Sequence, residues 1–233
     1  MPAAVYLIPT VLMEGQTDCL PAYLLDAVKN CQVFFVENER TARRYLRLLW
    51  KEMVIDDYGW YNMKELNAET ESAFRQKIRE EKNIGIISEA GCPGIADPGQ
   101  KLVAIAQEMN VNVKPLVGPN SILLALMASG MNGQHFQFHG YLPIDKMERS
   151  KKIISLENES RQKQCTQIFI ETPYRNGQML EALLNHCHKE TKICIAADLT
   201  APTEFIQTQT AGKWKSAIPE LHKRPAIFLL EAN

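Results

Sequence analysis

The sequence lacks the features that mark several large classes of protein. No apolar run among its 233 residues approaches the roughly 18 residues that a membrane-spanning helix needs. The first residues carry no basic segment ahead of an apolar one, so they favour an opening strand over a signal peptide. The formal net charge is −1, which excludes a general polyanion binder and leaves only local basic patches for contact with nucleic acid. We therefore expect a cytoplasmic protein with no membrane contact.

Motifs for metal, phosphate and hydrolase sites are missing as well. The six cysteines form no C-x-x-C pair, which is typical of reduced thiols in the cytosol. His186-Cys187-His188 resembles a ligand cluster, but neighbouring residues of a helix point to different faces and no second ligand pair is near. We therefore predict no metal. No Walker motif, complete G-x-G-x-x-G or convincing nucleophile–histidine pattern is present.

The chain has an ordinary globular composition, with 45% hydrophobic and 23% charged residues. In its first half, β-rich runs alternate with helical patterns, which predicts an α/β fold with a mainly parallel sheet covered on both faces. The predicted strands are Ala4–Ile8, Gln32–Glu37, Met53–Tyr58, Asn83–Ser88 and Val111–Leu116. The predicted helices are Pro21–Asn30, Thr41–Lys51, Thr70–Glu81 and Gly99–Met109.

The second half has a different pattern, closer to a mixed α+β arrangement. It starts with a turn at Gly118-Pro119-Asn120, so we place a domain boundary near Leu116–Gly118 and predict domains 1–116 and 117–233. Alternating apolar and polar residues predict an antiparallel strand at Phe205–Thr210. The other predicted elements are helices Ser121–Ser129, Lys146–Glu157 and Gly177–His186 and strands Phe136–Tyr141, Gln167–Glu171, Lys192–Ala197 and Ala226–Glu231.

The strongest local signal for a site is Ser88–Gly99, a glycine- and proline-rich segment between a buried strand and a helix. Ligands of open α/β sheets bind beyond the carboxyl ends of strands, where glycine lets the backbone approach closely. A plain connecting turn with Asp97 as a helix cap explains the same residues equally well.

Three further segments allow a functional or a structural interpretation. Arginines 40, 43, 44 and 47 share one helical face, which suits either phosphate contact or simple solvation. The segment Glu171–Arg175 follows a strand and suits either a site or a structural ion pair. Asp198-Leu199-Thr200, also at a strand end, is equally ambiguous.

Several motifs in order resemble the tetrapyrrole methylase family, and within it the branch that methylates a ribose 2′-hydroxyl of ribosomal RNA. Ser88–Gly99 is similar to the family's Ser-Asp-Ala-Gly-Thr-Pro…Asp-Pro-Gly stretch. The other similar segments are Pro115–Ser121, Phe138–Pro143, Glu171–Arg175, Ala196–Thr200 with Glu204, and Arg224–Ile227. The resemblance spans nearly the whole chain.

The resemblance implies two α/β/α domains, a mainly parallel N-terminal sheet and a mixed C-terminal sheet, with S-adenosylmethionine in the cleft between them and a homodimer as the usual assembly. The N-terminal domain would supply the substrate side and part of the cofactor site, and the C-terminal domain would supply further cofactor contacts. Carried over by position, the cofactor contacts are Pro9, Ser88, Glu89, Ala90, Gly91, Gly94, Ile95, Ser121, Ile122, Leu142, Ile170, Thr172, Leu199, Thr200, Pro225 and Ala226.

The sequence departs from the RNA branch mainly in the first domain. Thr10–Asp18 lacks the Gly-Asn that follows the branch's first proline, Glu-Asp-Thr-Arg becomes Glu37-Asn38-Glu39-Arg40, and Asp-Ala-Gly becomes Glu89-Ala90-Gly91. A ribose hydroxyl benefits from a base, for which Glu37, Glu39, Glu89 and Glu171 are candidates, with Arg40 and Arg175 as phosphate anchors. We prefer Glu37 and Arg40 on the substrate side and keep Glu171 as a further catalytic candidate.

Three hypotheses remain open at this point. The preferred one is a 2′-O-ribose methyltransferase acting on ribosomal RNA, which makes RNA a partner. The second is a methyltransferase for a tetrapyrrole or another small molecule. The third is a non-catalytic protein that binds S-adenosylmethionine.

Overall fold

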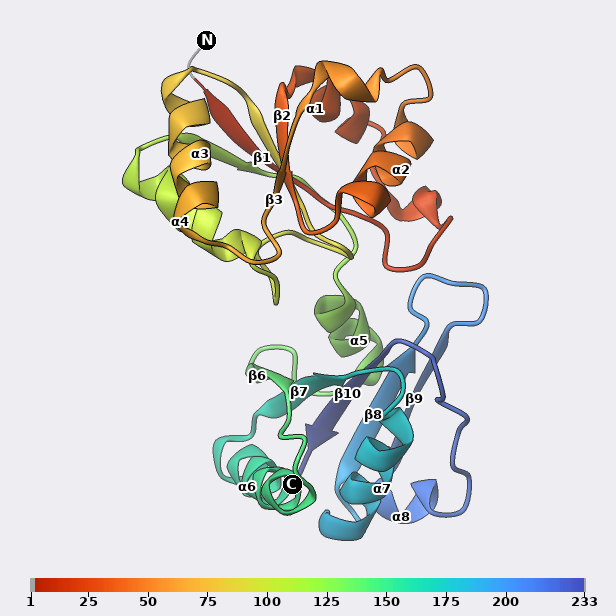
Figure 1. Ribbon diagram of the computed structural model, residues 1–233. Coiled ribbons are helices and arrows are strands. Elements are labelled where there is room, and N and C mark those ends of the chain that lie inside the picture. Colours follow the sequence, from red (N-terminus) through yellow and green to blue (C-terminus); the bar gives the residue numbers. More distant parts are fainter. Residues whose placement is uncertain (1–2, 233) are drawn as a thin grey trace. The chain divides into compact units, whose positions relative to one another are not determined.

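The computed structural model describes residues 3–232, which fold as two compact units (Figure 1). Unit 1 ends at Asn120 and unit 2 begins at Ser121. The boundary predicted from the sequence lies slightly earlier, at residues 116–117. The predicted domains begin at Met1 and end at Asn233. Met1, Pro2 and Asn233 lie outside the described residues.

Unit 1 is a parallel sheet between two layers of helices, in the strand order β3-β2-β4-β1-β5. Its strands are β1 (Ala4–Ile8), β2 (Val33–Val36), β3 (Gly59–Asn62), β4 (Ile84–Ile87) and β5 (Asn112–Pro115). Its helices are α1 (Leu24–Asn30), α2 (Glu39–Leu49), α3 (Ala68–Arg79) and α4 (Gly99–Glu108), with short 3-10 turns η1 (Thr17–Cys19) and η2 (Ile55–Asp57).

Alternating side chains of the strands fill two cores, one on each face of the sheet. Phe34 packs with α1 and α2, whereas its neighbour Phe35 packs with α3 and α4. Figure 1 shows these helix pairs on opposite sides of the strands. β4 is buried along its whole length, as its nearly continuous apolar sequence predicts for a strand covered on both faces.

The strand predicted at Met53–Tyr58 is wrong. That segment contains the turn η2, and the strand β3 follows it at Gly59–Asn62. Cross-strand aromatic pairs explain the choice, because β3 lies in register with β2 and stacks Trp60 on Phe34 and Tyr61 on Phe35. Met53 and Ile55 are buried in the core below, so their apolar character serves packing and not a strand.

Unit 2 contains a mixed sheet in the order β6-β7-β10-β8-β9. Its strands are β6 (Phe136–Tyr141), β7 (Thr166–Glu171), β8 (Lys192–Ala197), β9 (Phe205–Thr210) and β10 (Ala226–Glu231). Its helices are α5 (Ser121–Ser129), α6 (Lys146–Lys163), α7 (Asn176–His186) and α8 (Ala211–Trp214). β9 pairs antiparallel with β8, as its alternating sequence predicts.

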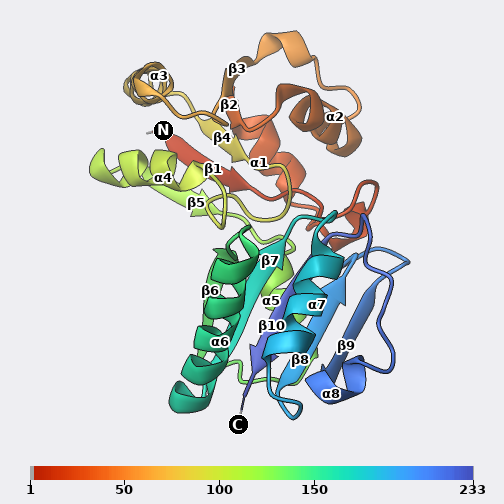
Figure 2. The same cartoon turned by 60° about the horizontal axis from the view of Figure 1, so that its bottom comes forward.

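The core of unit 2 lies between its sheet and α6, α7 and α8, and Figure 2 shows α6 and α7 in front of the sheet. Phe169 and Phe228 stack in this layer, with Trp214 of α8 fully buried. α5 packs on β8, β9 and β10 from the opposite face. The parallel sheet of unit 1 and the mixed sheet of unit 2 confirm the predicted α/β fold.

Candidate functional site

Two neighbouring strands of unit 1, β2 and β4, connect to helices on opposite faces of the sheet. β2 leads to α2 on one face of the sheet, and β4 leads to α4 on the other face. Loops that diverge in this way open a crevice at the carboxyl ends of the strands, where open α/β sheets bind their ligands. Glu37 follows β2 directly and Ser88 follows β4, so both lie at this crevice.

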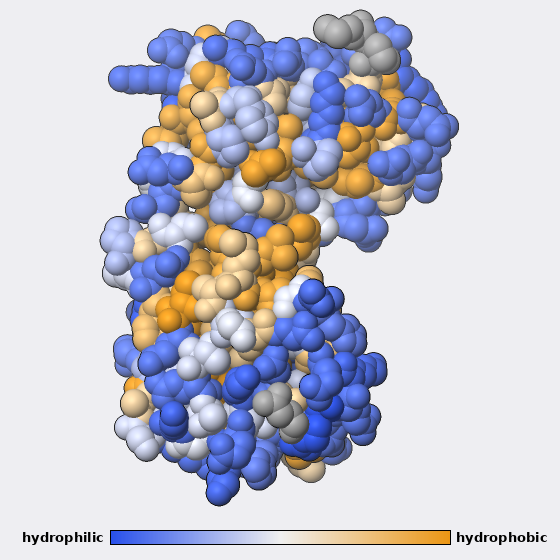
Figure 3. Space-filling view, turned by 180° about the vertical axis from the view of Figure 1, so that it is seen from behind, coloured by the Kyte–Doolittle hydropathy of each residue, from blue (hydrophilic) through white to orange (hydrophobic). Residues whose placement is uncertain are grey.

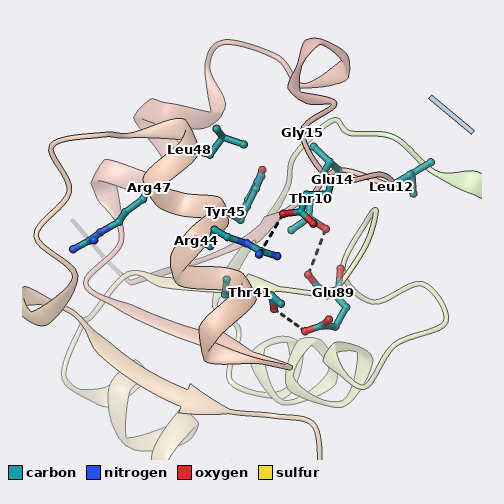
Figure 4. A pocket seen from close by; sticks show the side chains of 13 residues that line it. Thr10, Leu12, Glu14, Gly15, Thr41, Arg44, Tyr45, Arg47, Leu48 and Glu89 are labelled. Carbon is teal, nitrogen blue, oxygen red and sulfur yellow. Dashed lines mark hydrogen bonds and ion pairs between the residues drawn. The ribbon is translucent and has the colours of Figure 1, made fainter. Parts of the chain in front are cut away.

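A pocket of about 580 Å³ opens beside this crevice (Figure 4). Its walls come from the segment after β1, from α2 and from the first residues after β4. The lining residues are Thr10, Val11, Leu12, Glu14, Gly15, Thr41, Ala42, Arg44, Tyr45, Arg47, Leu48, Ser88 and Glu89. The volume is that of a typical small-ligand site, and the mixture of apolar walls and a few polar groups is also typical.

Short hydrogen bonds fix the base of the pocket. The Thr10 N–H donates to the Gly91 carbonyl at 2.8 Å, which ties the segment after β1 to the loop after β4. The Tyr45 hydroxyl donates to the Pro9 carbonyl at 2.5 Å and so holds α2 against β1. Burial raises the pKa of Tyr45, so this hydroxyl stays protonated as a donor.

Two glutamates stand one behind the other at the crevice. Glu89 lines the pocket, and its carboxylate accepts a hydrogen bond from the Thr41 hydroxyl at 2.8 Å. Glu37 accepts from the Glu89 backbone N–H at 2.9 Å, so its carboxylate orients the loop and is not among the lining residues. Burial is the main cause that raises the pKa of Glu37, and the nearby carboxylates of Asp97 and Glu89 add to it.

The arginines of α2 differ in what they contact. Arg43 pairs with Glu39 at 2.8 Å and lies over the Trp60 ring, so it has a structural role. Arg44 reaches Glu14 at 3.2 Å across the pocket, whereas Arg47 points away from Glu14 in Figure 4. Arg40 is exposed on the first turn of α2, outside the pocket lining.

The segment Ser88–Gly99 forms a structured loop. Gly91 and Gly94 have positive φ angles of 72° and 84°, a conformation that glycine adopts without steric cost. The Asp97 carboxylate accepts from the N–H groups of Gly94 at 2.9 Å and Gly99 at 2.7 Å. Asp97 thus holds the loop together, as well as bonding the first residue of α4. Ser88–Gly99 is therefore more than a minimal connecting turn. Asp97 and the two glycines order it, and Glu89 and Ala90 are exposed on it.

The register of the unit 2 sheet gathers the predicted cofactor residues at one end. Tyr141 pairs with Ile170, and Ala226 pairs with both Glu171 and Ala197. The carboxyl ends of β6, β7 and β8 therefore meet the start of β10. The predicted residues at this end are Leu142, Ile170, Thr172, Leu199, Thr200, Pro225 and Ala226. Ser121 and Ile122 form the first turn of α5.

Glu171 forms a buried ion pair through one of its carboxylate oxygens. One of its oxygens, Oε1, accepts from Arg175 Nη2 at 2.6 Å, from Arg175 Nε at 3.0 Å and from the Thr172 N–H at 2.6 Å. Its side chain is only 1% exposed. The geometry favours the structural alternative for the Glu171–Arg175 segment, in which the pair shapes the strand end around Thr172.

The loop after β8 is strained and holds an unpaired hydroxyl. Asp198 and Thr200 have φ angles of 51° and 72°, which are costly for residues with side chains. Arg224 at 2.7 Å and Thr203 at 3.0 Å fix the Asp198 carboxylate. The Thr200 Oγ1 is buried and has no hydrogen-bond partner within residues 3–232. A buried hydroxyl of this kind is suited to bind a polar ligand group.

Sequence patterns singled out Arg44 and Arg47 of α2 but not the other residues that this helix contributes to the pocket walls. Thr41, Tyr45 and Leu48 fall on one side of an ordinary amphipathic helix, and only the docking of α2 on β1 brings them to Glu89. The part of the chain that the structure describes has no helix long and apolar enough to cross a membrane. Residues 3–232 also hold no group of three or more metal-ligating side chains.

These two α/β units, with polar loops gathered at strand ends, have the architecture of a ligand-binding enzyme. Residues 15–214 match the family model described as Tetrapyrrole (Corrin/Porphyrin) Methylases. The chain therefore belongs to the tetrapyrrole methylase family of S-adenosylmethionine-dependent methyltransferases, which confirms the resemblance seen in the sequence.

Curated relatives carry the name ribosomal RNA small subunit methyltransferase I. The relative from Vibrio cholerae is 29% identical over 205 residues, which are 87% of this chain and 67% of that protein. The relative from Bacillus subtilis is 30% identical over 203 residues, which are 87% of this chain and 66% of that protein. The chain thus spans about two thirds of the length of these relatives.

A solved structure of a different methyltransferase has the same fold. Uroporphyrin-III C-methyltransferase from Thermus thermophilus, complexed with S-adenosylhomocysteine, matches with a TM-score of 0.58 at 15% identity. The match covers 98% of this chain and 97% of that one. The cofactor of the family is S-adenosylmethionine. Each unit, taken by itself, offers groups that suit a polar ligand: the unpaired Thr200 hydroxyl in unit 2 and the glycine loop of Ser88–Gly99 in unit 1.

Proposed function

We propose that this chain methylates a ribose 2′-hydroxyl of ribosomal RNA. The observation that carries the proposal is a pocket lined by a carboxylate, Glu89, and a cation, Arg44, in a chain whose relatives are named ribosomal RNA methyltransferases. A ribose flanked by a phosphodiester needs both kinds of group. This activity would place the protein in the cytoplasm, where ribosomes are assembled.

The geometry supports Glu89 as the group that orients the ribose hydroxyl and accepts its proton. Its carboxylate is exposed to the pocket and held by the Thr41 hydroxyl at 2.8 Å. Glu37 acts one step behind, because it positions the Glu89 backbone. Glu37, Glu89 and Arg40 remain candidates for the substrate side. Of these, we propose that Glu89 contacts the ribose hydroxyl directly.

Cofactor binding is proposed for the strand-end loops of the two units. In unit 1 the proposed contacts are Pro9, Gly94, Ile95 and the backbone of Ser88–Gly91. In unit 2, taken by itself, they are residues such as Thr200 and Ala226. S-adenosylmethionine supplies an electrophilic methyl group when bound, and the remaining work of the chain is to position the acceptor and exclude water. The Thr200 hydroxyl and the loop N–H groups are the donors available for it.

The proposal is tested by incubating the protein with methyl-labelled S-adenosylmethionine and RNA from cells that lack the protein. Label is expected in small-subunit ribosomal RNA, in dinucleotides that resist alkali because their 2′-oxygen is methylated. Label in an added porphyrin precursor, but not in RNA, would contradict the proposal in favour of a small-molecule acceptor. No transfer to any acceptor, with cofactor still bound, would favour a non-catalytic binding protein.

Glu89→Gln tests the assignment of the base. The variant is expected to lose about 10²- to 10⁴-fold in turnover, the usual contribution of general base catalysis, with cofactor affinity retained. Glu89→Asp keeps a carboxylate and should recover part of the rate. Equal turnover of Glu89→Gln and the unaltered chain would exclude Glu89 as the base and return the role to Glu37.

We also propose that the protein is a homodimer, joined through an apolar face of unit 2. Leu123 and Met127 of α5 are 48% and 79% exposed, and Phe136 and Tyr141 of β6 are 39% and 61% exposed. Both strand residues pair with β7 residues on the sheet face that carries α5. Figure 3 shows an apolar area on unit 2 around this helix. Contiguous exposed apolar surface of this kind is typical of an interface.

A further inference from the structure

The pocket contains one ion pair that joins two of its walls. Arg44 Nη1 of α2 lies 3.2 Å from Glu14 Oε1 in the segment after β1, and Figure 4 shows the arginine directed at this segment. Both side chains line the pocket. They are 63% and 77% exposed, so the pair faces solvent and a ligand can reach it.

Two other arginines of α2, Arg43 and Arg47, are not available in the same way, and Arg40 lies outside the pocket lining. Arg43 is held by Glu39 and by the ring of Trp60. Arg47 also lines the pocket, but its charged end points away from Glu14 (Figure 4). Arg44 is therefore the cation of α2 whose position over the pocket depends on a single exposed carboxylate.

A phosphodiester can engage Arg44 through two hydrogen bonds, whereas Glu14 holds it by one contact at 3.2 Å. The guanidinium offers a fork of N–H groups that matches two phosphate oxygens, whereas Glu14 engages one nitrogen. Exposed pairs of this kind contribute little to folding, so breaking the pair costs little. Glu14 also belongs to a segment without regular secondary structure, next to Gly15 at a φ of 82°.

We propose that Glu14 is an internal competitor that occupies Arg44 until the phosphodiester of an RNA ligand displaces it. The identity of the ligand rests on the proposed function. Glu14 then acts as a specificity-determining residue, because an acceptor gains Arg44 only if it brings an anion to replace the lost carboxylate. A neutral ligand of the same shape would leave Arg44 with Glu14.

The test is a double-mutant cycle on the affinity for RNA. The probe is a fluorescently labelled single-stranded RNA of ten nucleotides, bound to the full-length chain at several salt concentrations. The variants are Glu14→Gln, Arg44→Gln and the double substitution. Arg47→Gln, alone and with Glu14→Gln, is the matched control, because it removes the same charge from the same helix without touching Glu14.

Glu14→Gln is expected to bind RNA roughly two- to five-fold more tightly, the range that an exposed ion pair supplies. Arg44→Gln should weaken binding and lower the salt dependence by about one phosphate contact. The gain from Glu14→Gln should vanish when Arg44 is replaced and remain when Arg47 is replaced, because only Arg44 is coupled to Glu14.

A gain from Glu14→Gln that persists without Arg44 would overturn the proposal, since it would reflect long-range charge alone. Failure of all variants to bind RNA at low salt would overturn it too. Methyl transfer is measured in parallel. Coupling without methylation of RNA supports the competitor and rejects RNA as the methyl acceptor, whereas methylation without coupling rejects the competitor and leaves the proposed function intact.

Discussion

Glu37 is a half-buried carboxylate whose ionisation is disfavoured in the folded chain. Burial, more than the neighbouring carboxylates, raises its pKa above the ordinary glutamate value of about 4.3. Between these two pKa values the folded state binds more protons than the unfolded state, so stability falls as pH rises through this window. The loss begins near the ordinary value and is complete above the raised one.

Glu37→Gln should remove this loss while keeping an oxygen for the Glu89 N–H, which Glu37 binds at 2.9 Å. Thermal unfolding of both chains between about pH 4 and pH 7 measures the effect. The difference in melting temperature, variant minus unaltered chain, is expected to become more positive as pH rises. Burial is the largest cause of the raised pKa of Asp97 and is present in both chains, so most of that shift cancels. A difference that is independent of pH would refute the assignment of this titration to Glu37.

The helix α2 carries much of the pocket, and its first turn depends on one side chain. The Asn38 amide oxygen accepts from the N–H groups of Arg40 at 3.0 Å and Thr41 at 3.4 Å. The RNA branch has aspartate at this position. Aspartate and asparagine are both good N-cap residues, so this departure from the family pattern preserves the cap.

Replacing Asn38 by alanine is expected to cost about 1 kcal/mol of stability, the usual loss for an N-cap. Urea unfolding measures this as a lower midpoint with an unchanged slope. Asn38→Asp keeps an acceptor and is the matched control. If Asn38→Asp loses as much stability as Asn38→Ala, the cap is not the cause.

The elements with sharp boundaries in the sequence were predicted to the residue. The bounds of β1, α5 and β9 agree with the prediction because turn residues or a change of periodicity flank each of them. The helix α6 extends to Lys163, beyond its predicted end at Glu157. The prediction stopped early because the last turns are polar on most sides and show no apolar periodicity. Buried Ser160 fixes this extension through the N–H of Ala232, a contact that local sequence does not encode.

The candidate site was predictable only where a loop motif carries it. Glycines 91 and 94 and Asp97 stand out in the sequence, and their backbone geometry follows from their types. The role of Glu89 does not, because it depends on the Thr41 hydroxyl, 48 residues away. Glu37 likewise bonds to the loop of another strand, so its place behind Glu89 requires the order of strands in the sheet.

At the scale of the whole molecule, the exposed apolar face of α5 is a feature that a second copy of the chain would explain. α5 is apolar on nearly all sides, which is typical of a helix buried on more than one face. Met127 is 79% exposed on it. A second copy related by a twofold axis would cover the same face on both chains.

Met127→Glu should therefore convert the proposed dimer into a monomer, because a charge buried at a symmetric apolar interface meets its own copy or apolar surface. Sedimentation equilibrium of the full-length chain measures the mass. Ile154→Glu is the control, since Ile154 is an exposed apolar residue of α6, outside the α5 face. The dimer should survive this control. A monomeric unaltered chain, or equal loss with both variants, would rule out the α5 face as the interface.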